Sequence, residues 1–138
     1  MIYNIFKYLS LQFPNNTIFV NEKTILAGTT QIPDTYILLL ETGGTDKALF
    51  SNSTFQILVG DINNYNCRKL AYSIYNYITN NNNKRAGRFG QILPAYTNHA
   101  GETFPAIQVA QMSPIAKPQS LGKDENHSLY TMNIQMYI

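Results

Sequence analysis

Charged residues are scarce in this sequence. Asp, Glu, Lys and Arg make up 13% of its 138 residues, against about 25% in typical soluble domains. The formal net charge of +2 is also small, whereas nucleic-acid-binding domains usually carry a concentrated basic face. Charge alone therefore indicates no partner, and much of the surface is left to Asn, Gln, Ser, Thr and Tyr, which suits burial in an assembly as well as exposure to water.

Cysteine and histidine are too few for a metal centre. Cys67 is the only cysteine, which excludes an internal disulfide and a multi-cysteine zinc site and fits a reducing cytosol. His99 and His127 lie in separate polar stretches without HxxxH spacing, so we expect both to be surface residues. Cys67 lies on the apolar stripe of an expected helix, which predicts a buried small hydrophobe and not a nucleophile.

Long apolar runs are also missing. Runs such as Tyr36 to Leu40 are far short of the roughly 20 residues that span a bilayer. The N-terminal segment lacks a basic start, a continuous apolar core and a small-residue cleavage site, so it does not resemble a signal peptide. We therefore expect an intracellular protein, soluble when made, with no membrane partner.

Motifs for catalysis or phosphate binding are absent as well. Gly43 and Gly44 follow an expected strand, but no GKS/T follows them, which favours a turn. Asp124 and Glu125, with Glu41, are the carboxylates in the most specific surroundings, yet the ligand spacing of a calcium loop is missing. We assign no catalytic residue, no metal and no cofactor.

Hydrophobic periodicity predicts two helices. Ile2, Ile5, Phe6 and Leu9 form one helical face, and Pro14 ends that helix near Gln12. The second helix, from about residue 64 to 79, has the clearest 3.6-residue period, at Cys67, Leu70, Ala71, Ile74 and Ile78.

Extended patterns predict the strands. Alternation is clearest in residues 54–60 and in the terminal run 128–138, while Gly43 and Gly44 are expected to stop an earlier strand after Glu41. Pro114 and Pro118 are expected to prevent regular pairing from 113 to 120, before a polar turn that runs from Gly122 to Asn126. The expected strands are 17–20, 34–41, 54–60, 89–93, 106–112 and 128–138.

Together these elements predict a single α+β domain that covers residues 1–138. We expect an antiparallel or mixed sheet of about five strands, with the two main helices packed on one face. Residues 80–83 are four asparagines followed by Lys84 and Arg85, which predicts a mobile basic loop. The ten tyrosines, several of them on the second helix, either cap the edge of the core or form an interface, and the sequence leaves both readings open.

Several segments, in this order, resemble one family. ETGGT (41–45), FQILV (55–59), CRKLAYSIYNYI (67–78), QMSPIAKPQSLGKDEN (111–126) and YTMNIQMY (130–137) are similar to segments of the tail-terminator group of phage minor capsid and tail-completion proteins. The similarity covers most of the chain and thins from 79 to 104, and the order of the segments carries it more than any single motif.

The resemblance implies a non-enzymatic virion subunit, assembled in the host cytoplasm, that forms a six-fold ring. Such a ring ends the tail tube, contacts the tube protein and the neck or connector proteins, and lets DNA pass through its lumen. The residues expected at subunit or neck contacts are Glu41, Thr42, Gly43, Gly44, Thr45, Lys123, Asp124, Glu125 and Asn126. The residues expected to face DNA or a neighbouring ring are Lys84, Arg85 and Arg88.

Three other readings stay open. A head-completion or stopper subunit, or a minor capsid protein at the head–tail connector, shares the ring architecture. A small hydrolase or nuclease requires Glu41, Asp124 and Glu125 to converge around a metal. A free binding module requires a monomer with a concave apolar pocket.

Overall fold

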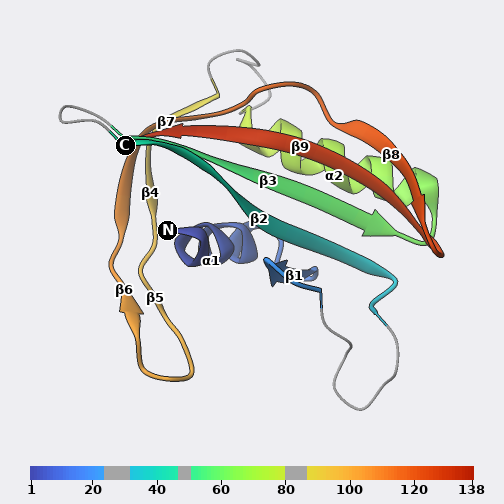
Figure 1. Cartoon of the computed structure of the whole chain (residues 1–138), viewed down its shortest axis with the longest axis horizontal. Helices are drawn as coiled ribbons and strands as arrows, with labels where there is room; N and C mark the ends of the chain where they lie inside the picture. The colour runs from blue at the N-terminus through green and yellow to red at the C-terminus, as the bar shows by residue number, and fades with distance from the viewer. Residues whose placement is uncertain (24–31, 47–50, 80–86) are drawn as a thin grey trace.

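The fold is one curved mixed sheet with two helices on its inner face (Figure 1). The computed structural model describes residues 1–23, 32–46, 51–79 and 87–138. The helices are α1 (Ile2–Gln12) and α2 (Asn64–Ile78). The strands are β1 (Thr17–Val20), β2 (Thr35–Asp46), β3 (Ser51–Asp61), β4 (Arg88–Leu93), β5 (Tyr96–Thr97), β6 (Thr103–Phe104), β7 (Ile107–Pro114), β8 (Gln119–Asp124) and β9 (His127–Tyr137).

The main sheet has the order β1-β2-β3-β9-β7-β4, and β8 adds a seventh strand by pairing with β9. β1 lies parallel to β2, while the other pairs in this sheet are antiparallel. β5 and β6 form a separate two-stranded hairpin. The predicted α+β class is confirmed, and the sheet has more strands than the five expected. Among the described residues, no helix has the length and apolar character needed to cross a membrane.

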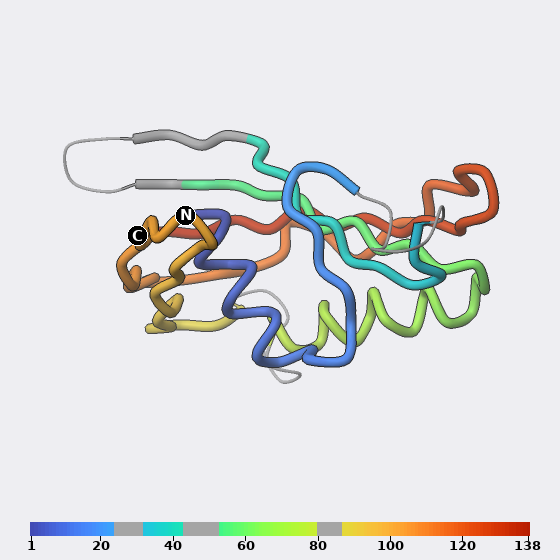
Figure 2. The backbone as a smooth tube through the Cα atoms, turned by 90° about the horizontal axis from the view of Figure 1, so that it is seen from below, coloured from blue at the N-terminus to red at the C-terminus, as the bar shows by residue number. Residues whose placement is uncertain are grey.

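Alternation along β3 and β9 builds the core. Phe55, Ile57 and Val59 on β3 pair in register with residues of β9, and each is almost fully buried. The facing apolar residues of β9 are buried too, and they are Tyr130, Met132, Ile134 and Met136. Both helices cover this face, so they lie on the same side of the sheet, as Figure 2 shows.

Helix α2 forms where its periodicity predicts. Asn63 is its N-cap, and the Asn63 side chain accepts a hydrogen bond of 3.1 Å from the backbone N–H of Asn66. Cys67, Ala71 and Ile78 on its apolar stripe are fully buried, which confirms the predicted burial of the cysteine. The helix ends at Ile78, one residue before the predicted end.

The prediction that Gly43 and Gly44 stop a strand is wrong. β2 continues to Asp46 and stays paired with β3, with Gly43 opposite Thr54 and Gly44 opposite Ser53. The register shifts between Glu41 and Gly43, so a bulge takes up one extra residue. Because β3 offers hydrogen-bond partners along this whole length, the two glycines extend the strand and do not end it. The expected Glu41–Thr45 turn is therefore strand.

The predicted gap in pairing from 113 to 120 is also wrong at both ends, since Ser113 and Pro114 pair with β9 at one end and Gln119 and Ser120 pair with it at the other. The expected turn from Gly122 to Asn126 is mostly strand β8, and only Glu125 and Asn126 connect β8 to β9. Gly122 has a φ of 84°, next to a register shift after Ser120, and this positive φ lets β8 bulge without breaking its pairing.

A buried amide attaches the β5–β6 hairpin to α1. The Asn4 side chain is 1% exposed, and its Nδ2 lies 3.0 Å from the carbonyl oxygens of Pro94 and Pro105 and 3.3 Å from that of Phe104. Tyr3 of α1 stacks on Tyr96 and Phe104 beside these contacts. The hydrogen bonds of Asn4 and these ring contacts therefore hold the hairpin against α1.

Removal of this amide should lower stability. We expect Asn4→Ala to reduce the free energy of unfolding by about 2 kcal/mol, because partly buried carbonyl oxygens lose their donor and the buried side chain is truncated. Urea unfolding followed by circular dichroism measures the change. Asn66→Ala, at an exposed position of α2, is the control and should change stability by about 0.5 kcal/mol or less. Equal effects of the two substitutions would contradict the anchoring role of Asn4.

Candidate functional site

Four of the predicted contact residues, Glu41, Asp124, Glu125 and Asn126, line two separate pockets. Glu41 lies beside a pocket of about 230 Å³ where β2 and β3 pass the N-terminal end of α1, and Ile2, Ile5 and Phe55 supply part of its apolar lining. The Glu41 carboxylate accepts a hydrogen bond of 3.4 Å from Asn21 Nδ2. The Glu41 backbone N–H donates to Asn21 Oδ1 at 3.3 Å, so Asn21 fixes the position of this carboxylate.

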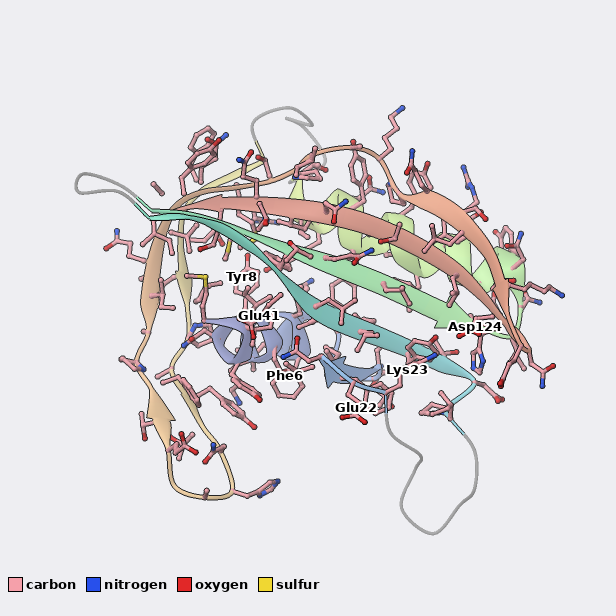
Figure 3. All side chains as sticks on the ribbon, viewed as in Figure 1. Phe6, Tyr8, Glu22, Lys23, Glu41 and Asp124 are labelled. Carbon is pink, nitrogen blue, oxygen red and sulfur yellow. The ribbon has the colours of Figure 1, made fainter. Side chains whose placement is uncertain are left out.

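The second pocket lies at the β8–β9 turn and has a volume of about 310 Å³. Asp124, Glu125 and Asn126 line it from the turn, and Lys23 lines it from the segment after β1. Lys23 Nζ lies 3.3 Å from Asp124 Oδ2 and forms the ion pair visible in Figure 3. This pair joins residues 101 positions apart in the sequence, so it links the β8–β9 turn to the segment that follows β1.

Tyr36 contacts the Lys23 side of this ion pair. Its hydroxyl lies 3.3 Å from Lys23 Nζ, and the ammonium lies 5.2 Å from the centre of its ring. The ring lies on Gly60 so closely that a Cβ there would be 2.4 Å from it, which explains why this position in β3 needs a glycine. Tyr36 is therefore fully buried although it lies on the sheet face opposite to the helices.

These contacts decide the direction of the pKa shift of Lys23. Burial by itself lowers the pKa of the ammonium group, but the hydrogen bonds and charge interactions with Tyr36 and Asp124 outweigh burial and raise it. A raised pKa in the folded state means that the contribution to stability is present below pH 10.5 and is lost as the pH rises through the folded pKa.

The two histidines differ from each other. His99 is exposed, as predicted. The surface prediction is wrong for His127, which is half-buried against Tyr36 with a distance of 5.3 Å between ring centres. Its Nε2 lies 2.8 Å from the carbonyl oxygen of Pro33, and because a carbonyl can only accept, the ring nitrogen donates.

The carboxylates of the hydrolase reading do not share a pocket. Glu41 lines the first pocket, whereas Asp124 and Glu125 line the second. Figure 3 shows Glu41 and Asp124 well apart on the sheet. The described residues contain no group of three or more His, Cys, Asp or Glu side chains that could hold a metal ion. Burial and the charge of Asp61 raise the pKa of the Cys67 thiol to about 11, so the thiol is protonated at neutral pH.

The basic segment is only partly described. Lys84 and Arg85 lie outside the described residues, and Arg88 is half-buried at the start of β4. Arg88 Nε donates to the carbonyl oxygen of Tyr77 at 2.6 Å, and its guanidinium lies 4.3 Å from the centre of the Tyr77 ring. Arg88 thus caps the C-terminal turn of α2, where cations are favoured.

The tyrosines of α2 divide between the two roles that the sequence left open. Tyr75 is buried in the core, and Tyr72 and Tyr77 pack against it while partly buried. Tyr65 is 70% exposed and is the tyrosine of this helix most available to a partner.

The sequence reading missed an exposed apolar strand. Phe89 and Ile92 on β4 are 61% and 62% exposed, and β4 ends the order of the main sheet. Residues 89–116 contain one charged residue, Glu102, and this depletion is the sequence signal that could have indicated a surface for a partner.

Comparison with protein-family models and with curated proteins finds no match for the chain. The geometry described above is therefore the basis for any functional assignment, together with the resemblance of its sequence segments.

The contact between Tyr36 and Lys23 should contribute to stability in a pH-dependent way. We expect Tyr36→Phe to reduce the free energy of unfolding by about 1 kcal/mol at pH 7, because the hydroxyl that contacts the ammonium is lost. The difference from wild type should narrow as the pH rises above 10.5 toward the raised pKa of Lys23 in the folded state. Urea unfolding at a series of pH values measures both effects. Tyr65→Phe is the exposed control, and a difference independent of pH would contradict this role of Lys23.

The cap formed by Arg88 should also be measurable. We expect Arg88→Ala to reduce the free energy of unfolding by about 1 to 3 kcal/mol, because the carbonyl oxygen of Tyr77 loses a charged donor. Lys117→Ala, at an exposed position, removes the same charge and should have a smaller effect. If both variants unfold at the same urea concentration, Arg88 does not stabilise the end of α2 and becomes available for other contacts.

Proposed function

We propose that this chain is a non-enzymatic structural subunit of a tailed-phage particle that closes into a ring at the end of the tail tube. The resemblance of the segments at 41–45, 55–59, 67–78, 111–126 and 130–137 to the tail-terminator group supports this proposal. The order of elements agrees with it, because a leading helix, two long paired strands, a second helix and a closing strand follow one another.

The observation that carries the proposal is the set of large hydrophobic side chains that the described part of the chain exposes. A subunit that works by assembly must bury surface against other subunits, and large apolar side chains left in water indicate where. The exposed large hydrophobic residues of the described part are Met1, Tyr3, Leu11, Ile62, Tyr65, Phe89, Ile92, Ile115, Leu121 and Ile138. A ring needs a heterologous contact, in which two different patches of one subunit meet in neighbouring copies.

The proposed role does not require the chain to recognise a DNA sequence. A lumen through which DNA passes needs non-specific contacts at most, and a few cations on a loop supply them. Arg88 is committed to α2, so Lys84 and Arg85 are the remaining candidates from the basic segment for such contacts.

Electron microscopy of particles tests the proposal. In a phage that lacks this gene, we expect full heads beside unjoined tails, with many tails longer than normal, because nothing ends the growth of the tube. Negative staining with tail lengths recorded is the measurement, and expression of the chain from a plasmid should restore joined particles of normal tail length. Intact infectious particles without the gene would overturn every structural role proposed for this chain.

The same images separate the second candidate, a head-completion or stopper subunit. Such a protein acts on the portal side, so its loss should leave tails of normal length and heads that have lost their DNA. Tail length therefore distinguishes the two positions, although both predict the same ring symmetry.

A further inference from the structure

The sheet carries an uncharged surface on the side opposite to the helices. Register places Leu40, Gln56 and Asn133 in one row across three strands, with Leu58 and Thr131 in the next row. We call this surface the outer sheet face; its residues are Leu40, Thr54, Gln56, Leu58, Thr131, Asn133 and Gln135. None of these is charged, and all except Thr131 are half-buried or exposed. Figure 1 views the sheet from this side.

A second uncharged surface lies on β4 and β7. The register pairs Ile92 of β4 with Gln108 of β7, and Gly90 and Ala110 lie two residues further along these two strands. We call this surface the β4 flank; its residues are Phe89, Gly90, Ile92, Gln108 and Ala110, all exposed. Within the described residues no strand pairs with the outer edge of β4, so this flank also offers free backbone hydrogen-bonding groups.

The two surfaces face in different directions. β4 runs across one end of the molecule at a steep angle to β3 and β9 in Figure 1, and Figure 2 shows it displaced toward the helix side. One molecule thus presents two distinct uncharged patches, and a heterologous contact that closes into a ring requires two such patches.

The absence of charge determines what can cover these surfaces. These surfaces are poorly suited to DNA, because non-specific DNA binding gains most of its affinity from Lys and Arg side chains that neutralise phosphates. An uncharged surface is buried without the cost of desolvating ions, and a matching partner is likewise uncharged. Exposed charges near the two surfaces are few: Glu41 of β2 pairs with the core residue Phe55 and so lies on the other face from Leu40, and Glu102 lies at the β5–β6 turn. The remaining exposed charges among the described residues are Glu22, Asp34, Arg68, Lys69, Lys117, Lys123, Asp124 and Glu125. The chain itself therefore carries a matching pair of surfaces.

We propose that the β4 flank of one copy docks on the outer sheet face of the next copy, and that this contact closes the ring. The inference rests on the proposed function, because it names the two surfaces through which the subunit assembles. Phe89 and Ile92 are the apolar anchors, and the half-buried Leu40 and Leu58 lie on the receiving face among amide and hydroxyl groups. Residues near the centre of such a contact carry most of its binding free energy.

Two blocking variants test the contact. The first variant carries Phe89→Lys and Ile92→Lys and blocks the β4 flank. The second carries Asn133→Lys and Gln135→Lys and blocks the outer sheet face. Each variant adds two positive charges. Glu102→Lys changes the net charge by the same amount at the exposed turn between β5 and β6, and serves as the matched control. Sedimentation velocity and native mass spectrometry measure assembly, and circular dichroism verifies that each variant is folded.

We expect the wild type and the control to form rings, and each blocked variant to be a monomer with a dissociation constant raised about 100-fold or more. A mixture of the two blocked variants should give a one-to-one dimer and no ring, because each supplies the surface that the other lacks. Lysines on both blocked surfaces prevent those surfaces from pairing with each other.

Other outcomes overturn the inference in distinguishable ways. Rings from either blocked variant would show that the subunits meet elsewhere, and the proposed function would stand without this contact. Dimers from one blocked variant alone would indicate an isologous contact and would also exclude the proposal. A wild type that stays monomeric at every concentration and on isolated tail tubes would overturn both the contact and the ring.

Discussion

The antiparallel register between β3 and β9 is the constraint on which the rest of the structure depends. It runs without interruption from Asp61 paired with Ser128 to Asn52 paired with Tyr137. Because side chains alternate between the two faces, a shift of β9 by one residue against β3 would move Met132, Ile134 and Met136 to the outer face and bring the amides between them to the inner face. The apolar face that both helices need exists in this register alone, so the register determines which side of the sheet becomes core.

The same alternation produces the outer sheet face. Once the apolar residues of β2, β3 and β9 point toward the helices, the intervening residues point outward, and they are amides, hydroxyl groups and leucines without charge. At one end of this face the chain provides its own cover, because the ring of Tyr36 lies over Gly60 and contacts His127. Further along the strands Leu38 and Thr131 are still buried, whereas Asn133 is exposed. Exposed sheet faces of soluble proteins usually carry charge, so this composition is typical of a surface that a partner covers.

Periodicity in the sequence predicts the parts of the fold that local patterns control. Helix α2 and strands β3 and β9 have long, regular patterns, and the structure places them within a few residues of the predicted bounds. The errors lie where a partner strand overrides local preference: Gly43 and Gly44 remain paired because β3 continues beside them, and β8 forms because Gly122 allows a bulge. The Lys23–Asp124 pair and the Arg88–Tyr77 cap join residues that no local pattern connects, so sequence reasoning could not find them.

A low content of charge has opposite consequences for a free protein and for a subunit. Exposed ions keep free proteins soluble and apart, while in an assembly every ion within a contact must lose its water or find a partner. This chain confines the exposed charges of its described elements largely to α2, the β8–β9 turn and the β5–β6 turn, where Arg68, Asp124 and Glu102 remain in water. The β4 flank and the outer sheet face can therefore be buried with little electrostatic cost, while a contact through a charged region must desolvate or pair its ions. Specificity for one orientation then comes from where the charges are as much as from the apolar anchors.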